Sequence, residues 1–187
     1  MIQNILKQMG KDHVSWKAKW NLTKFKDADN KIAETLQAGA STYQIISENP
    51  EAFLGSESWE HNLALNEGLG ELIDLAFGLG SPTAFDGTAG YLGVGDSATA
   101  ASASQTGLQA ATNKTYVVFD DSYPARTNQT VECRATFGSA VGNHGWQEFT
   151  IANGDSDAAK NLNRKVEDKG TKASGESWTL SLSITFS

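Results

Sequence analysis

The sequence is poor in the residues that cross-link a chain or anchor it in a membrane. It has a single cysteine, Cys133, in 187 residues, so no disulfide can form within the chain. No stretch reaches the roughly 18 consecutive apolar residues that suggest a membrane-spanning helix, and the first residues lack the apolar core and cleavage site of a secretory signal. We therefore expect no membrane association, a reducing cytoplasm as the place of folding, and Cys133 buried as a small apolar side chain.

Basic residues are also scarce, and their distribution is uneven. The net charge of −7 argues against nucleic-acid binding, because that function needs a basic surface. Residues 1–31 carry seven Lys and three Asp, whereas residues 32–87 carry nine acidic residues and no Lys or Arg. These blocks are either two solvated faces or a basic arm that docks on an acidic surface of its own chain or of a neighbour.

The arm hypothesis names candidate contacts. Residues 14–25 alternate between apolar and polar side chains, which predicts a strand with a basic outer face. A short amphipathic helix over residues 1–9 is predicted to precede it. The candidate partner-binding residues are Lys7, Lys11, Trp16, Lys17, Lys19, Trp20 and Lys24.

Few residues of the sequence are candidates for catalysis or metal binding. His13, His61 and His144 are far apart in the sequence, and neither a catalytic triad nor a zinc motif surrounds them. We therefore expect no catalytic residues, no metal ligands and no cofactor. Two acidic pairs, Asp120 with Asp121 and Asp155 with Asp157, either bind calcium weakly or only form turns, and the sequence leaves this open.

One glycine-rich motif is typical of either a cofactor site or a tight bend of the chain. Residues 93–98, GVGDSA, match the G-x-G-x-x-G/A pattern of a dinucleotide-binding loop. Such a site requires a parallel sheet built from alternating strands and helices, but the residues after 115 predict antiparallel strands. We therefore predict that Gly93 and Gly95 relieve crowding where a strand bends into a loop.

The second half of the chain predicts a mainly β fold. Alternating segments between turn residues predict strands at 89–95, 115–120, 130–138, 146–152, 162–167 and 177–186. Their spacing predicts an antiparallel β-sandwich, of jelly-roll or immunoglobulin-like type.

The last of these strands carries the clearest pattern. Its large apolar residues face one way: Trp178, Leu180, Leu182, Ile184 and Phe186. We expect this face on the core, and the alternate Thr and Ser residues toward solvent or a partner subunit.

Residues 62–79 predict one buried helix. Apolar residues recur at helical spacing from Leu65 to Ala76, Asn66 is the expected cap, and Gly78 is the expected end. The chain then divides into an N-terminal arm at 1–61, with a short helix and strand, and a helix-plus-sandwich domain at 62–187.

Short motifs appear in a distinctive order between residues 62 and 187. They are LNEGL and EL at 65–72; YLGVG, TA and QTGL at 91–108; ATF, WQEF and IANG at 135–154; and LNRK and GTK at 162–172. In this order they resemble a family of structural proteins of tailed-bacteriophage virions.

The resemblance implies a non-enzymatic virion component, most specifically a capsid decoration (cement) protein that binds neighbouring capsid subunits. Its implied partners are the major capsid protein or other virion proteins, and self-association into a homo-oligomer is expected. The alternatives are a minor tail, collar or fibre-base protein, or a carbohydrate- or receptor-binding module. The implied location is the particle surface, after a stage in the host cytoplasm.

Overall fold

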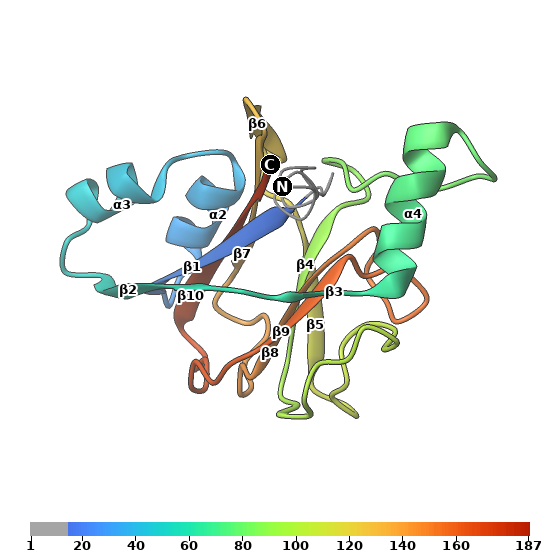
Figure 1. Ribbon diagram of the computed structural model, residues 1–187. Coiled ribbons are helices and arrows are strands. Elements are labelled where there is room, and N and C mark those ends of the chain that lie inside the picture. The colour runs from blue at the N-terminus through green and yellow to red at the C-terminus, as the bar shows by residue number, and fades with distance from the viewer. Residues whose placement is uncertain (1–14) are drawn as a thin grey trace, which may run out of the picture.

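The computed structural model describes residues 15–187 and contains two antiparallel sheets of five strands each (Figure 1). Sheet 1 has the strand order β2-β1-β10-β7-β6, and sheet 2 has the order β3-β9-β8-β4-β5. The sheets pack face to face around a shared core. The predicted antiparallel β-sandwich is confirmed.

The strands of sheet 1 are β1 (Trp16–Lys26), β2 (Phe53–Glu60), β6 (Ala125–Thr127), β7 (Thr130–Phe137) and β10 (Glu176–Phe186). Those of sheet 2 are β3 (Leu63–Ala64), β4 (Tyr91–Gly95), β5 (Lys114–Val118), β8 (Glu148–Ala152) and β9 (Asn163–Val166). The helices are α2 (Lys31–Gln37), α3 (Thr42–Glu48) and α4 (Asn66–Phe77). All six strands predicted after residue 88 are present, whereas β2, β3 and β6 were not predicted.

The predicted division at residue 61 does not separate an arm from a sandwich. Strand β1 lies between β2 and β10 in sheet 1, and it pairs with β10 along its whole length, from Trp16 opposite Phe186 to Lys26 opposite Glu176. Residues 16–60 therefore belong to the sandwich. The helix expected over residues 1–9 lies outside the described residues.

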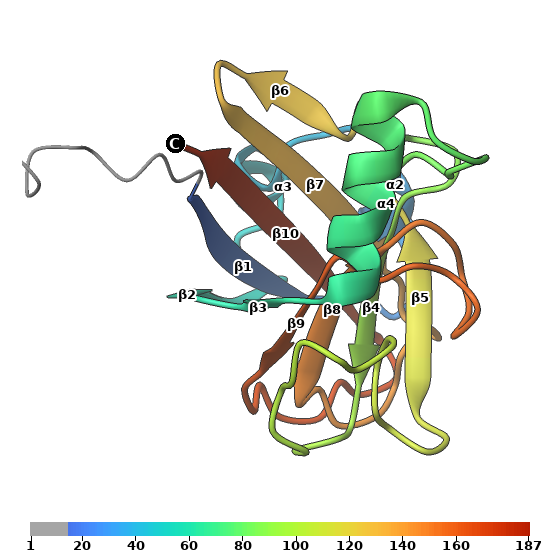
Figure 2. The same cartoon turned by 45° about the vertical axis from the view of Figure 1, so that its right-hand side comes forward.

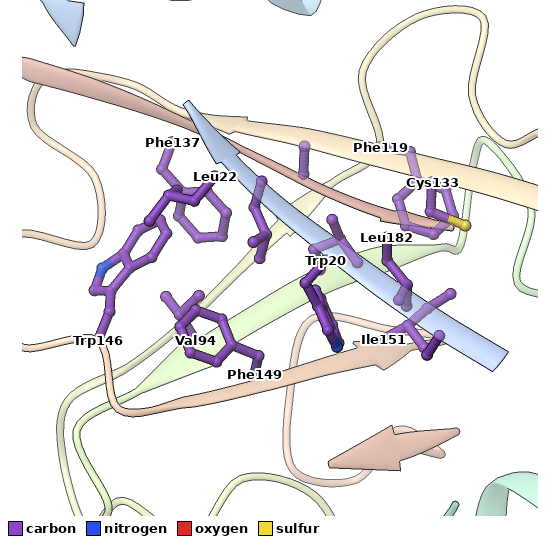
Figure 3. Packing of buried hydrophobic residues seen from close by; sticks show 14 of the residues in the cluster. Trp20, Leu22, Val94, Phe119, Cys133, Phe137, Trp146, Phe149, Ile151 and Leu182 are labelled. Carbon is purple, nitrogen blue, oxygen red and sulfur yellow. The ribbon is translucent and has the colours of Figure 1, made fainter. Parts of the chain in front are cut away.

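The core lies between the two sheets and is rich in aromatic residues. Figure 3 shows side chains of sheet 1, such as Trp20 and Leu182, facing side chains of sheet 2, such as Val94 and Phe149. The Trp20 and Phe149 ring centroids are 5.9 Å apart. Cys133 is buried in this core as expected, and burial raises the pKa of its thiol to about 12. A thiol in this state is a poor nucleophile.

Helices α2 and α3 cover part of the outer face of sheet 1, around a small second cluster formed by Phe25, Leu36 and Ile45. Because these helices lie over sheet 1, the predicted exposure of the Thr and Ser face of β10 is wrong at one position. Thr179 was expected to face solvent or a partner subunit, but it is only 1 % exposed, and its hydroxyl lies 3.1 Å from that of Thr136. The sequence pattern showed which face was polar but not that helices lie over one end of it.

Helix α4 lies within the predicted range 62–79, and Gly78 ends it with a left-handed φ of 64°. Its predicted start is wrong, because Asn66 is the first helical residue rather than the cap and Leu63–Ala64 form β3. The expected burial is wrong. The helix contacts the sandwich through the buried Gly68 and the partly buried Leu72, and Leu65 just before it is buried too, while Phe77 at its end is 75 % exposed. Figure 2 shows α4 running along the outside of the sandwich. Within residues 15–187, no helix is both long and apolar enough to cross a membrane.

Candidate functional site

The seven predicted partner-binding residues do not form one surface. Lys7 and Lys11 lie outside the described residues. Trp20 is fully buried in the core and so cannot contact a partner, which corrects that prediction. Its place follows from the alternation of β1, since even-numbered residues of this strand point between the sheets.

Lys24 also differs from the prediction, because it points to the inner side of sheet 1 at the end of the sandwich. Its ammonium lies 3.1 Å from the Glu57 carboxylate and 4.2 Å from the centre of the Trp178 ring. Burial favours the neutral Glu57 carboxyl, but hydrogen bonds from Lys24 and Lys169 outweigh this and lower its pKa. Lys24 thus has partners within its own chain.

Of the predicted partner-binding residues, only Lys17 and Lys19 lie together on the outer face of sheet 1. Two grooves that share Lys19 and Ser183 run along this face, with volumes of 410 and 540 Å³. The larger is lined by Lys17 and Trp16 among others, and the smaller lies against α3. Both volumes fall within the range of small-molecule sites.

We call the smaller one the sheet 1 groove. Its floor and rim come from β1, β10, β2 and β7, and its wall comes from α3. The lining residues are Lys19, Asn21, Thr23, Thr42, Tyr43, Ile46, Ser56, Glu132, Ser181 and Ser183. Apart from one lysine and one glutamate, these side chains are uncharged, and hydroxyl groups dominate.

A second surface lies on α4 and is apolar. Leu69, Ile73 and Phe77, spaced four residues apart, form an exposed stripe, with Ile73 at 54 % exposure. We call them the α4 stripe. Beside it, Leu69, Trp16 and Phe186 line a mainly apolar groove of 320 Å³ at the ends of β1 and β10. The sequence analysis predicted burial of α4 from the spacing of its apolar residues. That spacing indicates an apolar face, but it does not show whether anything covers this face.

The glycine motif does not form the strand, turn and helix of a dinucleotide-binding loop. Gly93 and Gly95 lie within β4, which pairs antiparallel with β5 and β8, and within the described chain no helix follows it before β5. A side-chain carbon at Gly93 would lie 2.7 Å from the Tyr116 ring, and one at Gly95 would lie 2.4 Å from the Glu148 carboxylate. The glycines are structural, as predicted, but the reason is close packing against the sheet rather than a bend.

The Glu148 carboxylate beside Gly95 belongs to a buried network. It accepts hydrogen bonds from Arg164 Nε at 2.7 Å and from the backbone nitrogens of Gln109 and Ala110 at 2.8 and 2.7 Å. Both charged side chains are 0 % exposed. Because the network has no access to solvent, it holds the loop before β5 against sheet 2 and offers no site for a substrate.

One member of each acidic pair considered for calcium is engaged in other contacts. Asp120 is buried and bonded to Arg134 Nε at 2.7 Å and to both the backbone nitrogen and the hydroxyl of Thr136 at 2.8 Å. Asp157 lies 2.6 Å from Lys114 Nζ. Within residues 15–187, no three His, Cys, Asp or Glu side chains gather as a metal site would require.

One hydroxyl–imidazole pair has the spacing of a nucleophile and a base. Thr115 Oγ1 lies 3.0 Å from His144 Nε2. The other ring nitrogen, Nδ1, lies 2.9 Å from the backbone oxygen of Gly145, which takes the place where a triad would have its carboxylate. Neither residue lines a groove described above, so the pair does not support a catalytic role.

Comparisons with known proteins found no relative. No protein-family model matches the chain, and neither a curated protein nor a solved structure matches it at a significant level.

Proposed function

We propose that this protein is a non-enzymatic structural component of a tailed-bacteriophage virion, and specifically a capsid decoration protein. In this role it binds the major capsid protein and neighbouring copies of itself at the particle surface. The observation that carries the proposal is the exposed α4 stripe of Leu69, Ile73 and Phe77. Contiguous apolar surface of this kind marks an interface more often than a solvated face.

The energetics favour coverage of the α4 stripe. Full burial of a Leu, Ile or Phe side chain contributes about 1.5–3 kcal/mol, and all three are between 41 and 75 % exposed. A partner that covers them therefore gains on the order of 1 kcal/mol from each. Contacts of this strength are weak singly and become strong when repeated over a symmetric particle.

The motifs that resemble virion proteins also support the proposal, because they meet in space. Glu67 at the start of α4 accepts hydrogen bonds from the backbone nitrogens of Gly107 and Asn161, at 3.1 and 2.9 Å. Arg164 bonds Glu148 at 2.7 Å and Gln105 Oε1 at 3.1 Å. At least one motif from each of the four stretches thus lies on α4, on sheet 2 or in a loop bonded to them, while ATF lies in β7 of sheet 1. This grouping is what a shared architecture would produce.

The test replaces the apolar centre of the α4 stripe with charge. The double variant Ile73→Lys/Phe77→Lys should keep its fold, because both side chains are exposed, and should lose at least tenfold in binding to particles that lack the protein. Tyr43→Lys, an exposed aromatic position on α3, is the control and should bind normally. Co-sedimentation measures the affinity, and wild-type binding by the double variant would contradict the proposal.

Copy number separates decoration from the other virion locations. Quantitative mass spectrometry of purified particles should find this chain in proportion to the major capsid protein. A count limited to the low symmetry of a tail, collar or fibre base would replace the decoration role with one of those locations.

A further inference from the structure

The floor of the sheet 1 groove is a rigid platform of polar side chains. Asn21 of β1 lies opposite Ser181 of β10, and Lys19 lies opposite Ser183. Because alternate residues of a strand share a face, all four side chains point to the same side of the sheet. Strands β1 and β10 are inner strands of sheet 1, paired on both sides, so this floor is fixed before any ligand arrives.

The floor has free hydrogen-bonding capacity. The Asn21 side-chain oxygen accepts a hydrogen bond from the Thr23 hydroxyl at 3.2 Å, which leaves the amide nitrogen available as a donor. Among the described residues, the hydroxyls of Ser181 and Ser183 have no hydrogen-bond partner, although both line the groove. Each hydroxyl can donate one hydrogen bond and accept others.

Two opposite charges flank this floor without neutralising each other directly. Lys19, Ser183 and Glu132 lie in one row across three adjacent strands. Strands are about 4.8 Å apart, so the backbones of Lys19 and Glu132 are separated by roughly 10 Å. Within residues 15–187, neither forms a salt bridge with another side chain. The groove thus offers a strong donor and a strong acceptor with no net charge.

The wall of the groove carries an exposed aromatic ring. Tyr43 on α3 is 87 % exposed, the highest value among the large hydrophobic side chains of the described chain. Helix α3 is held in place by Ser41, which accepts a hydrogen bond from the Gln44 backbone nitrogen at 3.1 Å, and by the buried Ile45. The negative face of an aromatic ring attracts weakly positive C–H groups, and the faces of a sugar ring present such groups.

Other ligand classes fit this groove less well. A nucleic acid or another polyanion needs excess positive charge, whereas Lys19 is matched by Glu132 and the chain carries −7. A peptide that adds a strand needs a free sheet edge, whereas this floor is the face of inner strands. A compact apolar ligand would leave the floor amide and hydroxyls without partners.

We propose that the sheet 1 groove binds an uncharged oligosaccharide. One sugar ring stacks on Tyr43 while its hydroxyls exchange hydrogen bonds with Asn21, Ser181 and Ser183. Lys19 and Glu132 donate to and accept from hydroxyls at the rim. This activity goes beyond the structural role proposed above, because it uses a different surface and would let an assembled particle bind glycans.

The test is a glycan array probed with the full chain, followed by calorimetric titration of a neutral oligosaccharide that binds. Tyr43→Ala should weaken binding about tenfold or more, and Asn21→Ala should also weaken it, whereas Tyr43→Phe keeps the ring and should stay within a few-fold of wild type. Phe77→Ala is the matched control, an exposed aromatic residue on another helix, and should leave affinity unchanged. Affinity should be the same at low and high salt, because the ligand is uncharged.

Three outcomes would overturn the proposal: no neutral glycan binds at millimolar concentration, binding is the same in Tyr43→Ala as in wild type, or only sulfated and sialylated glycans bind and salt abolishes this. Circular dichroism of each variant checks the fold. Because the assay uses the isolated protein and the groove contains no residue of the α4 stripe, its failure leaves the decoration role untouched, and failure of the α4 test leaves this site untouched.

Discussion

Replacing Gly95 with alanine tests whether a glycine in β4 exists to make room for a buried charge. The added carbon would lie 2.4 Å from Glu148 Oε1 and 3.0 Å from Glu148 Cδ. Non-bonded atoms prefer about 3.5–4.0 Å, so the carboxylate must move by roughly 1 Å. Such a shift strains its hydrogen bonds to Arg164 and to the backbone nitrogens of Gln109 and Ala110.

The expected cost follows from those bonds. A hydrogen bond to a charged group contributes about 1.5–3 kcal/mol, and Glu148 and Arg164 are both 0 % exposed, so water cannot replace what is lost. Serious weakening of two such bonds gives about 3 kcal/mol, a large share of the 5–15 kcal/mol typical of a domain. The melting temperature should fall by about 6–12 °C.

Urea unfolding followed by tryptophan fluorescence measures this cost, since the chain has five tryptophans. Gly70→Ala is the matched control, because no atom lies within 4 Å of its added carbon and Gly70 is inside α4. Alanine there should be neutral or slightly stabilising, through its higher helix propensity.

Repeating Gly95→Ala in a protein that lacks the Glu148 carboxylate tests whether contact with that carboxylate causes the loss of stability. In a Glu148→Ala protein the obstructing carboxylate is gone, so adding Gly95→Ala should then cost less than about 1 kcal/mol. The reasoning fails if Gly95→Ala costs equally in both backgrounds, or if it costs under about 1 kcal/mol in the wild-type protein.

Four further predictions follow from burial and charge. Leu182→Ala should lower the free energy of unfolding by about 2–5 kcal/mol in urea titrations, as for other fully buried leucines. Thr179→Ala should cost about 1 kcal/mol or more, whereas Ser183→Ala on the same strand should cost about 0.5 kcal/mol or less, and equal costs would contradict the cover by α2. Burial lowers the pKa of Lys172 to about 8, so the folded state binds fewer protons than the unfolded state between pH 8 and 10.5. The free energy of unfolding should therefore rise with pH in this range, and Lys172→Met should remove that dependence on pH. Deleting residues 1–14 should leave the melting temperature by calorimetry unchanged, because both sheets lie within residues 16–186, and a large drop would refute this.

Sequence patterns predicted those strands whose two faces differ strongly. Strand β10 alternates large apolar residues with Thr and Ser, and β1 and β7 do the same, so their existence and core faces were predictable. The exception is Phe186 at the end of β10, which was expected in the core but is 38 % exposed. Strand β2 was missed because only Trp59 in it is buried, which leaves too little contrast between its faces. Alternation also could not distinguish an arm from an inner strand, since the pattern of β1 is the same in either place.

The polar interior could not be predicted, because the fold brings its partners together from different elements and no fixed spacing in the sequence marks them. Glu148 of β8 meets Arg164 of β9, and Asp120, which lies between β5 and β6, meets Arg134 in the middle of β7. In the sequence these are single charges among many. Ser181 and Ser183 were predicted to face away from the core, but only the position of α3 showed that they line a groove.

The two proposed surfaces lie on different elements, and this separation bears on how they could work together. Figure 1 shows α3 on one side of the sandwich and α4 on the other. A protein held on a particle through the α4 stripe would therefore keep Tyr43 and the sheet 1 groove away from that contact. Glycan affinity should then be unchanged between free and particle-bound protein, while many copies per particle would raise the avidity. If particle binding instead blocked the glycan, the capsid would have to cover the α3 side, and the α4 stripe would need a different partner.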